Sequence, residues 1–217
     1  MFRGVVTGRP APVLAAVGGL VIALLLGAPG PGPPGDPPAR THVDGQPSEA
    51  VQPARRADSQ VVAEPPLSLR LPGGTTVAVR PVGTRADGRL AVPDDVHTAG
   101  WWRGGMRVGD PFGAILVAGH VDSRTQGLGP YAALLSARAG QEVVVRTATL
   151  WQRFRIRSLR LIPQGPLRDR PGLHSPRGPR RLVLVTCAPP YDPARGGYQH
   201  LAVVTALPVG RPVRRGT

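Results

Sequence analysis

The apolar run LVLVTC, which spans Leu182–Cys187, ends in the only cysteine of the chain. A second run of the same kind, ILVAGH over Ile115–His120, ends in a histidine. Short continuous apolar runs between turn residues are typical of fully buried strands. A thiolate is the reactive form of cysteine, and a nearby imidazole can stabilise it and shuttle protons. The two runs therefore predict a cysteine nucleophile and its base, which only the fold can bring together.

Further strand candidates recur between Gly and Pro turn residues on either side of these two runs. We expect strands over residues 67–71, 75–82, 114–118, 142–147, 152–162, 181–186 and 201–207. Residues 151–157, WQRFRIR, alternate apolar and polar side chains, as a half-buried strand does. Helical patterning is thin, and its best segment is Pro130–Ala139. Many short strands with Gly and Pro turns predict a mainly β fold, a closed or nearly closed β-barrel with short helices.

The formal charge of +14 raises nucleic acid as a partner, but the origin of the charge argues against it. The chain has no lysine, and its arginines are abundant together with Ala, Gly and Pro. They are scattered, with no aromatic residues interleaved among them. We therefore expect a solvated basic surface facing an anionic envelope and no nucleic-acid partner. One cysteine and dispersed histidines give no disulfide framework and no metal-ligand spacing, so neither a metal nor a cofactor is expected.

Residues 1–28 have the pattern of a membrane helix or a signal peptide. Arg3 and Arg9 precede the apolar segment, and such charges keep the N-terminus inside and place the rest of the chain outside. No Ala-x-Ala cleavage site follows, and the prolines there disfavour cleavage. We expect an uncleaved anchor in the cell membrane and an extracellular domain, with secretion as the alternative.

The chain changes composition twice after this segment. Residues 29–66 are rich in Pro and Gly, lack hydrophobic periodicity and cannot bury a core, which predicts a disordered, semi-extended stalk. The strand candidates fill residues 67–209, which we expect to be the catalytic domain. Residues 210–217 form a basic tail.

Several segments of this domain together resemble one family. They are LAVPDD over residues 90–95, GWWRGG over 100–105, PFGAILVAGHVDSR over 111–124, LVTC over 184–187 and the stretch from 192 to 206. In this order they resemble the class F sortases of actinobacteria, which are class E-like in older schemes. The pairing of a run that ends in Gly-His with a later run that ends in Thr-Cys is the specific part of the match.

The resemblance implies an eight-stranded sortase-type β-barrel with transpeptidase activity. Cys187 would attack a threonyl carbonyl in an LPXTG-like sorting signal of a secreted protein, and His120 would act as general acid and base. An acyl-thioester would form, and a cell-wall precursor or another amine would resolve it. The membrane would be a partner through the N-terminal helix.

The chain departs from the family at one functional position. Sortases carry an arginine at the start of the last strand, and Gln199 stands there in this chain. Loss of one oxyanion donor costs on the order of 10²–10³ in rate. Either Gln199 donates in its place or Arg195, four residues earlier, compensates. The same substitution supports an alternative: a weak or silent sortase-fold module that only binds a sorting signal or wall peptide.

Other readings of single residues stay open at this point. Taken alone, Cys187 is better interpreted as an inert, buried small hydrophobe, and its place where the strand must leave the barrel favours the nucleophile. His200 is a second choice for the functional histidine. Asp122 either orients His120 or forms a turn. The acyl group could be transferred either to an amine or to water, and the sequence is compatible with both.

Overall fold

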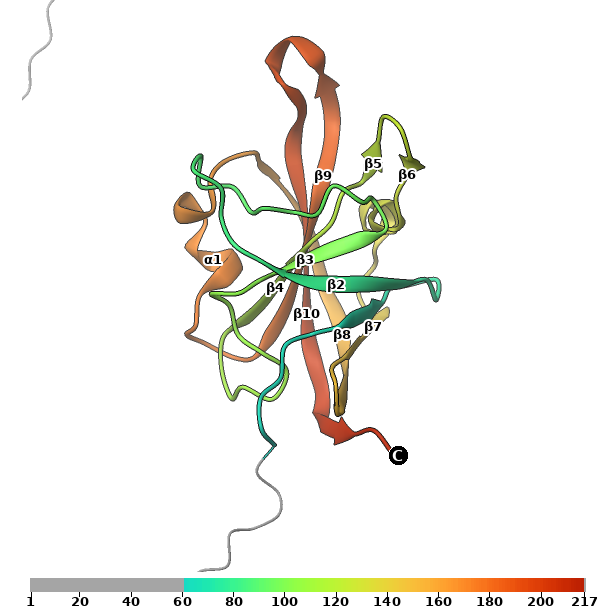
Figure 1. Ribbon diagram of the computed structural model, residues 1–217, viewed down its shortest axis with the longest axis vertical. Helices are drawn as coiled ribbons and strands as arrows, with labels where there is room; N and C mark the ends of the chain where they lie inside the picture. Colours follow the sequence, from blue (N-terminus) through green and yellow to red (C-terminus); the bar gives the residue numbers. More distant parts are fainter. Residues whose placement is uncertain (1–60, 217) are drawn as a thin grey trace, which may run out of the picture. The chain divides into compact units, whose positions relative to one another are not determined.

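Eight strands close into a barrel in the spatial order β1-β2-β3-β4-β9-β10-β8-β7. The computed structural model describes residues 61–216 (Figure 1). The barrel strands are β1 (Ser68–Arg70), β2 (Thr76–Val82), β3 (Thr98–Trp102), β4 (Ala114–Ala118), β7 (Glu142–Arg146), β8 (Leu150–Pro163), β9 (Arg181–Asp192) and β10 (Gly197–Arg214). The predicted mainly β, closed eight-stranded barrel is confirmed.

Short elements complete the described part of the chain. Strands β5 (Asp122–Ser123) and β6 (Gly127–Leu128) form a small ribbon, and η1 (Pro130–Ser136), η2 (Leu167–Asp169) and η3 (Pro193–Arg195) are 3-10 helices. The α-helix α1 (Pro171–His174) is one turn long. The helix predicted over Pro130–Ala139 is thus a 3-10 helix that ends at Ser136. Its buried side chains recur every third residue, at Tyr131, Leu134 and Ala137, which matches the three-residue turn of a 3-10 helix.

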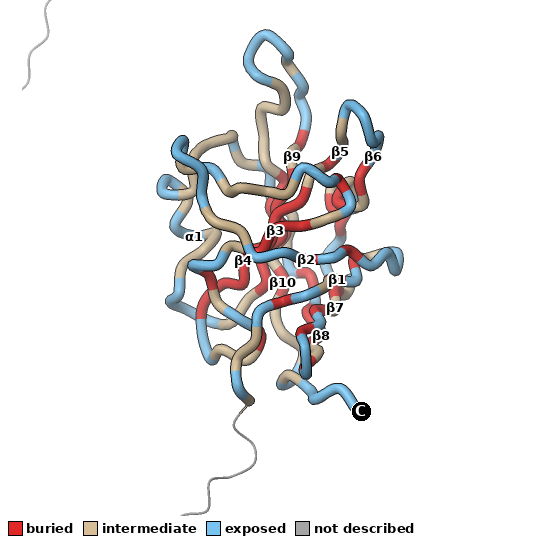
Figure 2. Tube along the Cα trace, viewed as in Figure 1, coloured by how far each residue is buried: buried red, intermediate tan, exposed pale blue. Residues whose placement is uncertain are grey.

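The position of β4 in the sheet explains why its sequence is apolar without interruption. All five of its residues are buried, because both faces of this part of the sheet are covered. Ile115 and Val117 belong to the core inside the barrel. Leu116 and Ala118 belong to a second apolar cluster on the outer face, which side chains from the β2–β3 loop and from the 164–175 segment cover. Figure 2 shows this buried centre and the exposed hairpin tips around it.

Parallel pairing places the ends of two strands together. β4 pairs in parallel with β9, and Ala118 stands opposite Val185. β10 pairs antiparallel with both β9 and β8. The residues that follow β4 and those that continue β9 therefore emerge at the same end of the barrel.

The largest differences from the predicted strands concern β9, β10 and β3. β9 and β10 were predicted over 181–186 and 201–207, but both continue beyond the barrel as a two-stranded ribbon (Figure 1). The prolines and glycines of this ribbon are residues typical of turns, and they hide its strand pattern. β3 was not predicted, because Gly100 interrupts its apolar pattern. A Cβ atom at Gly100 would lie 2.8 Å from Cγ2 of Val82, so close packing on β2 requires glycine there.

The N-terminal predictions lie mostly outside the described residues. The anchor over 1–28 and the stalk from 29 to 60 belong there. Within residues 61–216, no helix is long and apolar enough to cross a membrane. Glu64, placed in the stalk by the sequence, exchanges backbone hydrogen bonds of 2.9 Å with Val108, and its carboxylate accepts from the amide of Thr149 at 2.9 Å. β10 in turn continues to Arg214, within the segment expected to be a tail.

Candidate active site

A cavity of about 420 Å³ lies over the outer face of β4, β9 and β10. The β2–β3 loop and the 164–175 segment form its walls. The floor and the lower walls are apolar: Leu116 and Leu201 come from the strands, Leu90 and Val92 from the loop, and Leu167 and Leu173 from the 164–175 segment. A concave, largely apolar site with a few polar groups is typical of a ligand pocket, and this volume lies in the usual range.

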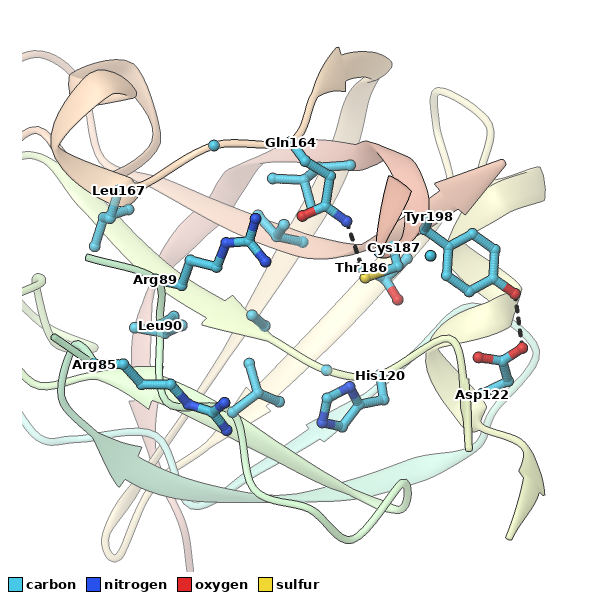
Figure 3. Close-up of a pocket in the computed structure, with 18 of the residues that line it drawn as sticks. Arg85, Arg89, Leu90, His120, Asp122, Gln164, Leu167, Thr186, Cys187 and Tyr198 are labelled. Atoms are coloured by element: carbon cyan, nitrogen blue, oxygen red, sulfur yellow. Dashed lines mark hydrogen bonds between the residues drawn. The ribbon is translucent and has the colours of Figure 1, made fainter. Parts of the chain in front are cut away.

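The cavity contains both residues of the predicted catalytic pair. The backbone amide of Gly119 donates to the carbonyl oxygen of Val185 at 3.0 Å, which continues the parallel pairing of β4 and β9 by one residue. His120 follows Gly119 just after the end of β4, and Cys187 comes two residues after Val185 on β9. Both side chains line the cavity (Figure 3). The fold therefore brings into one cavity two residues that are 67 positions apart in the sequence.

Gly119 is required by the packing beneath this corner. A Cβ atom at Gly119 would lie 2.6 Å from Cδ2 of the Tyr131 ring. Tyr131 is fully buried in the barrel core and cannot give way easily. The Gly-His sequence thus reflects close contact between the strand end and an aromatic ring.

The Cys187 thiol is partly buried and has one hydrogen-bond donor. Nε2 of Gln164 lies 3.6 Å from Sγ of Cys187, and the Gln164 amide points at the sulfur in Figure 3. Burial raises the pKa of the Cys187 thiol, and the negative charge of Asp122 adds to the rise, whereas Gln164 and Arg89 oppose it. The resting sulfur is therefore protonated at neutral pH, and its proton must pass to a base before it attacks a carbonyl.

The Asp122 carboxylate is hydrogen-bonded to a tyrosine. Its Oδ2 accepts a hydrogen bond of 2.7 Å from the Tyr198 hydroxyl (Figure 3), which together with burial raises the pKa of Tyr198 to about 12. The ring of Tyr191 packs edge-on against Tyr198, with 5.0 Å between ring centroids. Within the described residues, Asp122 makes no hydrogen bond to His120. Asp122 and Tyr198 instead tie the β4–β5 turn to the start of β10.

The structure places Arg195 and Gln199 away from the cavity lining. Nε of Arg195 donates to Oδ2 of Asp192 at 2.6 Å. The amide of Gln199 donates to the carbonyl oxygen of Gly197 at 2.6 Å and is within 3.4 Å of that of Arg195. The register of β10 against β9 shifts between Tyr198 and His200, so Gln199 lies in a bulge. Both side chains that were predicted to stabilise the oxyanion therefore donate their hydrogen bonds within the loop that precedes β10.

His200, the second choice for the histidine, also lies outside the lining. Its Nδ1 is 3.1 Å from the carbonyl oxygen of Pro189 on the neighbouring strand. Of the two histidines, His120 therefore shares the cavity with Cys187 and His200 does not.

Polar groups that sequence reasoning did not select line the cavity instead. Gln164 follows β8, and its backbone amide donates to the carbonyl oxygen of Gln199 at 3.0 Å. The hydroxyl of Thr186 is buried without a hydrogen-bond partner in the described part of the chain. Arg89 comes from the β2–β3 loop. A glutamine in a loop and an arginine among many carry no sequence signal, so only the fold identifies them.

A metal centre has no support among residues 61–216, where no three His, Cys, Asp or Glu side chains gather. The chemistry available in the cavity is that of a thiol, an imidazole, the Asp122 carboxylate and neutral or cationic hydrogen-bond donors. This set suits acyl transfer through a covalent thioester.

Comparison with known proteins gives the same class. The sortase-domain family matches residues 74–209, well over half of the chain. The protein therefore belongs to the sortase family, whose members are in general cysteine transpeptidases of the cell envelope. A search of curated proteins found no match.

Solved structures show that the fold is that of sortases. Sortase A from Listeria monocytogenes aligns with a TM-score of 0.51 at 14% identity, over 72% of this chain and 93% of that one. Sortase C of Streptococcus pneumoniae has a TM-score of 0.51 at 13% identity, over 71% and 73% of the two chains. Sortase A from Corynebacterium diphtheriae has a TM-score of 0.50 at 14% identity, over 68% and 62%.

Proposed function

We propose that this sortase is a cysteine transpeptidase that cleaves an LPXTG-like sorting signal and transfers the protein to a cell-wall amine, as a class F enzyme. The observation that carries the proposal is the shared cavity of Cys187 and His120 at the parallel ends of β4 and β9. An inert structural cysteine has no reason to face a histidine across an open, apolar-floored pocket.

The first half-reaction forms the acyl-enzyme. The Cys187 proton passes to His120, and the thiolate attacks the threonyl carbonyl carbon to form a C–S bond. When the tetrahedral intermediate collapses, the C–N bond breaks and the leaving amine takes the proton from the imidazolium. The product is a thioester on Cys187 and a released peptide amine.

The second half-reaction regenerates the thiol. An acceptor amine attacks the thioester carbonyl and loses a proton to His120, the C–S bond breaks, and the sulfur recovers the proton. Water in place of the amine would give hydrolysis by the same steps. The open cavity admits both, so the two outcomes are distinguished by product analysis.

Gln164 is the donor that we propose for the developing oxyanion. Its amide is the side-chain group already hydrogen-bonded to the attacking sulfur, at 3.6 Å. A carbonyl oxygen on the carbon bonded to that sulfur would lie close to the same amide. Arg195 and Gln199 would have to leave their present hydrogen bonds to serve instead.

The alternative is a catalytically silent module that binds a sorting signal or wall peptide. It is favoured by one observation, the neutral Gln199 at the position of the family arginine, whose amide is occupied by loop carbonyls. In that case the cavity would bind peptide but no thioester would form.

We propose that the segment 1–28 anchors the chain in the membrane and that the expected stalk, shortened to residues 29–60, carries an extracellular barrel. The apolar composition after Arg3 and Arg9 supports the anchor. Full-length protein should then stay with membranes after carbonate extraction. A shortened chain in the medium would show a cleaved signal peptide instead.

The function is tested with the detergent-solubilised full-length chain. It is incubated with a panel of LPXTG-like peptides and an amine acceptor. The products are separated by chromatography and identified by mass spectrometry. Peptide cleaved after threonine and joined to the amine supports transpeptidation, and cleavage without joining supports hydrolysis. A panel that remains intact with wild type and Cys187→Ala alike would favour the silent module.

A further inference from the structure

The cavity is strongly basic around its apolar floor. Its lining contains four arginines, Arg85, Arg89, Arg124 and Arg170, and a single carboxylate, that of Asp122. Asp122 is already hydrogen-bonded to Tyr198. The lining therefore has a formal excess of three positive charges, and a cleft with charge of one sign and apolar walls concentrates ligands of the opposite sign.

These arginines are not held by carboxylates of the protein. Among residues 61–216, Arg85, Arg124 and Arg170 have no acidic side chain within 4.0 Å. Arg89 is 3.9 Å from Asp87, but both side chains are more than half exposed, so this pair contributes little. Nε of Arg170 is buried without any hydrogen-bond partner in the same residues. Nη2 of Arg170 donates to the carbonyl oxygen of Pro163 at 3.0 Å, so the guanidinium groups that remain available to a ligand are those of Arg85, Arg89 and Arg124.

Two hydrogen-bonded segments hold the arginines in place. The amide of Arg85 donates to the carbonyl oxygen of Arg89 at 2.7 Å, which closes the turn of the β2–β3 loop. The amide of Leu167 donates to the carbonyl oxygen of Gly88 at 2.9 Å and ties this turn to η2. In Figure 3 the Arg85 and Arg89 side chains both extend into the cavity, Arg89 on the side of Gln164 and Cys187 and Arg85 on the side of His120.

We propose that this cavity selects a sorting peptide that carries an acidic side chain close to the scissile threonine, with Arg85 and Arg89 binding its carboxylate. The inference rests on the proposed function, because it names the peptide class that the site would accept. The apolar floor would hold the hydrophobic part of the peptide. A guanidinium suits this task, because its planar fork matches a carboxylate and stays charged at every physiological pH.

The same charges would attract an anionic wall polymer, so the test separates the two ligands. Binding is measured on full-length Cys187→Ala chain in detergent, by fluorescence anisotropy with labelled peptides. The peptides are Leu-Pro-Glu-Thr-Gly and its isosteric Gln partner, and a series in which Glu occupies each neighbouring position. Poly(glycerol phosphate) serves as the competing polymer.

The acidic peptide at its best position should bind at least about tenfold more tightly than its Gln isostere, since charge-assisted hydrogen bonds are about twice as strong as neutral ones. The preference should shrink at high salt. The double variant Arg85→Gln, Arg89→Gln should lower it to about threefold or less. Arg157→Gln, an exposed arginine on β8 outside the cavity lining, should leave it unchanged. Circular dichroism checks that each variant is folded.

Equal binding of the Glu and Gln peptides at every position would overturn the proposal. So would a preference that survives the double variant. Polymer binding that is lost in the double variant, with equal binding of the Glu and Gln peptides, would assign the site to the anionic polymer instead. Because the readout is binding to a chain without its thiol, it does not depend on acyl transfer. Acid-selective binding without any thioester in the wild type would refute the proposed transpeptidation and leave the acid-binding subsite standing.

Discussion

Ala118 of β4 stands directly opposite Val185 of β9 in a parallel pair. His120 and Cys187 each follow two residues later, so the histidine and the thiol lie at the same end of the barrel and line one cavity. An antiparallel pair would send the same two runs to opposite ends of the barrel. The parallel register is therefore the structural basis of the candidate site.

The two histidines near this site should differ sharply when removed. His120→Ala should lower the acyl-transfer rate by about 10²-fold or more, because a positioned acid–base group contributes on this order. His200→Ala should change it less than about threefold, since its ring contacts the backbone of Pro189 outside the cavity. Steady-state peptide cleavage measures both. A dead His200→Ala enzyme beside an active His120→Ala enzyme would reverse the assignment.

The glutamines give a second matched pair. Gln164→Ala should lower kcat by about tenfold or more, because an oxyanion donor is lost. Gln199→Ala should have a smaller effect, since its amide donates to loop carbonyls. Arg195→Ala, which breaks an exposed ion pair with Asp192, should behave like Gln199→Ala. Single-turnover acylation rates are the appropriate measurement. Full activity of Gln164→Ala would return the role to another group of the lining, such as Thr186 or Arg89.

The Cys187 thiol should titrate above the ordinary thiol value of 9.0, because burial raises its pKa. The native thiol then stays protonated where the unfolded one ionises. Its contribution to stability is fully present below the unfolded pKa and is lost as pH rises through the native pKa. The pH profile of iodoacetamide alkylation should thus have a higher midpoint in native than in urea-denatured protein. Gln164→Ala should move the native midpoint further up, and a native midpoint below the denatured one contradicts this account.

Gly119→Ala should destabilise the barrel by about 1–3 kcal/mol, as overpacking of a core does. The added methyl group would meet the buried ring of Tyr131 at 2.6 Å. Gly172→Ala is the control, since nothing lies within 4 Å of the added atom. Thermal unfolding should show a melting temperature at least about 3 °C lower for Gly119→Ala. Equal melting temperatures for the two variants would mean that the strand end shifts freely.

The fold was accessible from sequence where a strand has an uninterrupted apolar run or a regular alternation of apolar and polar residues. β4 was predicted with its observed ends, Ala114 and Ala118, because both of its faces are covered and its apolar run has no interruption. β3 was not, because the packing of Gly100 on Val82 is a tertiary contact that leaves only a weak local pattern. The ribbon of β9 and β10 beyond the barrel contains prolines and glycines that locally indicate a turn.

The candidate site was accessible in part for a similar reason. Cys187 and His120 end buried apolar runs, and such runs can be recognised in the amino-acid sequence alone. Gln164 and Arg89 come from loops whose positions depend on contacts with distant segments, such as the bond from Gln164 to Gln199. The sequence-based choice of Arg195 and Gln199 considered only the loop before β10, where the structure shows both side chains bonded locally.

The central claim is that Cys187 forms an acyl-thioester. Full-length wild type and Cys187→Ala are incubated with an LPXTG-like peptide in the absence of an amine. The reactions are quenched in acid, and the mass of each intact protein is measured by mass spectrometry. The account predicts that wild type alone gains the mass of the peptide's acyl part, that hydroxylamine removes this mass, and that fragmentation places it on Cys187. Cys187→Ala should remain folded, because its side chain lies at a cavity wall. A folded wild-type protein that binds peptide and gains no mass, or that gains it equally in Cys187→Ala, would contradict the account.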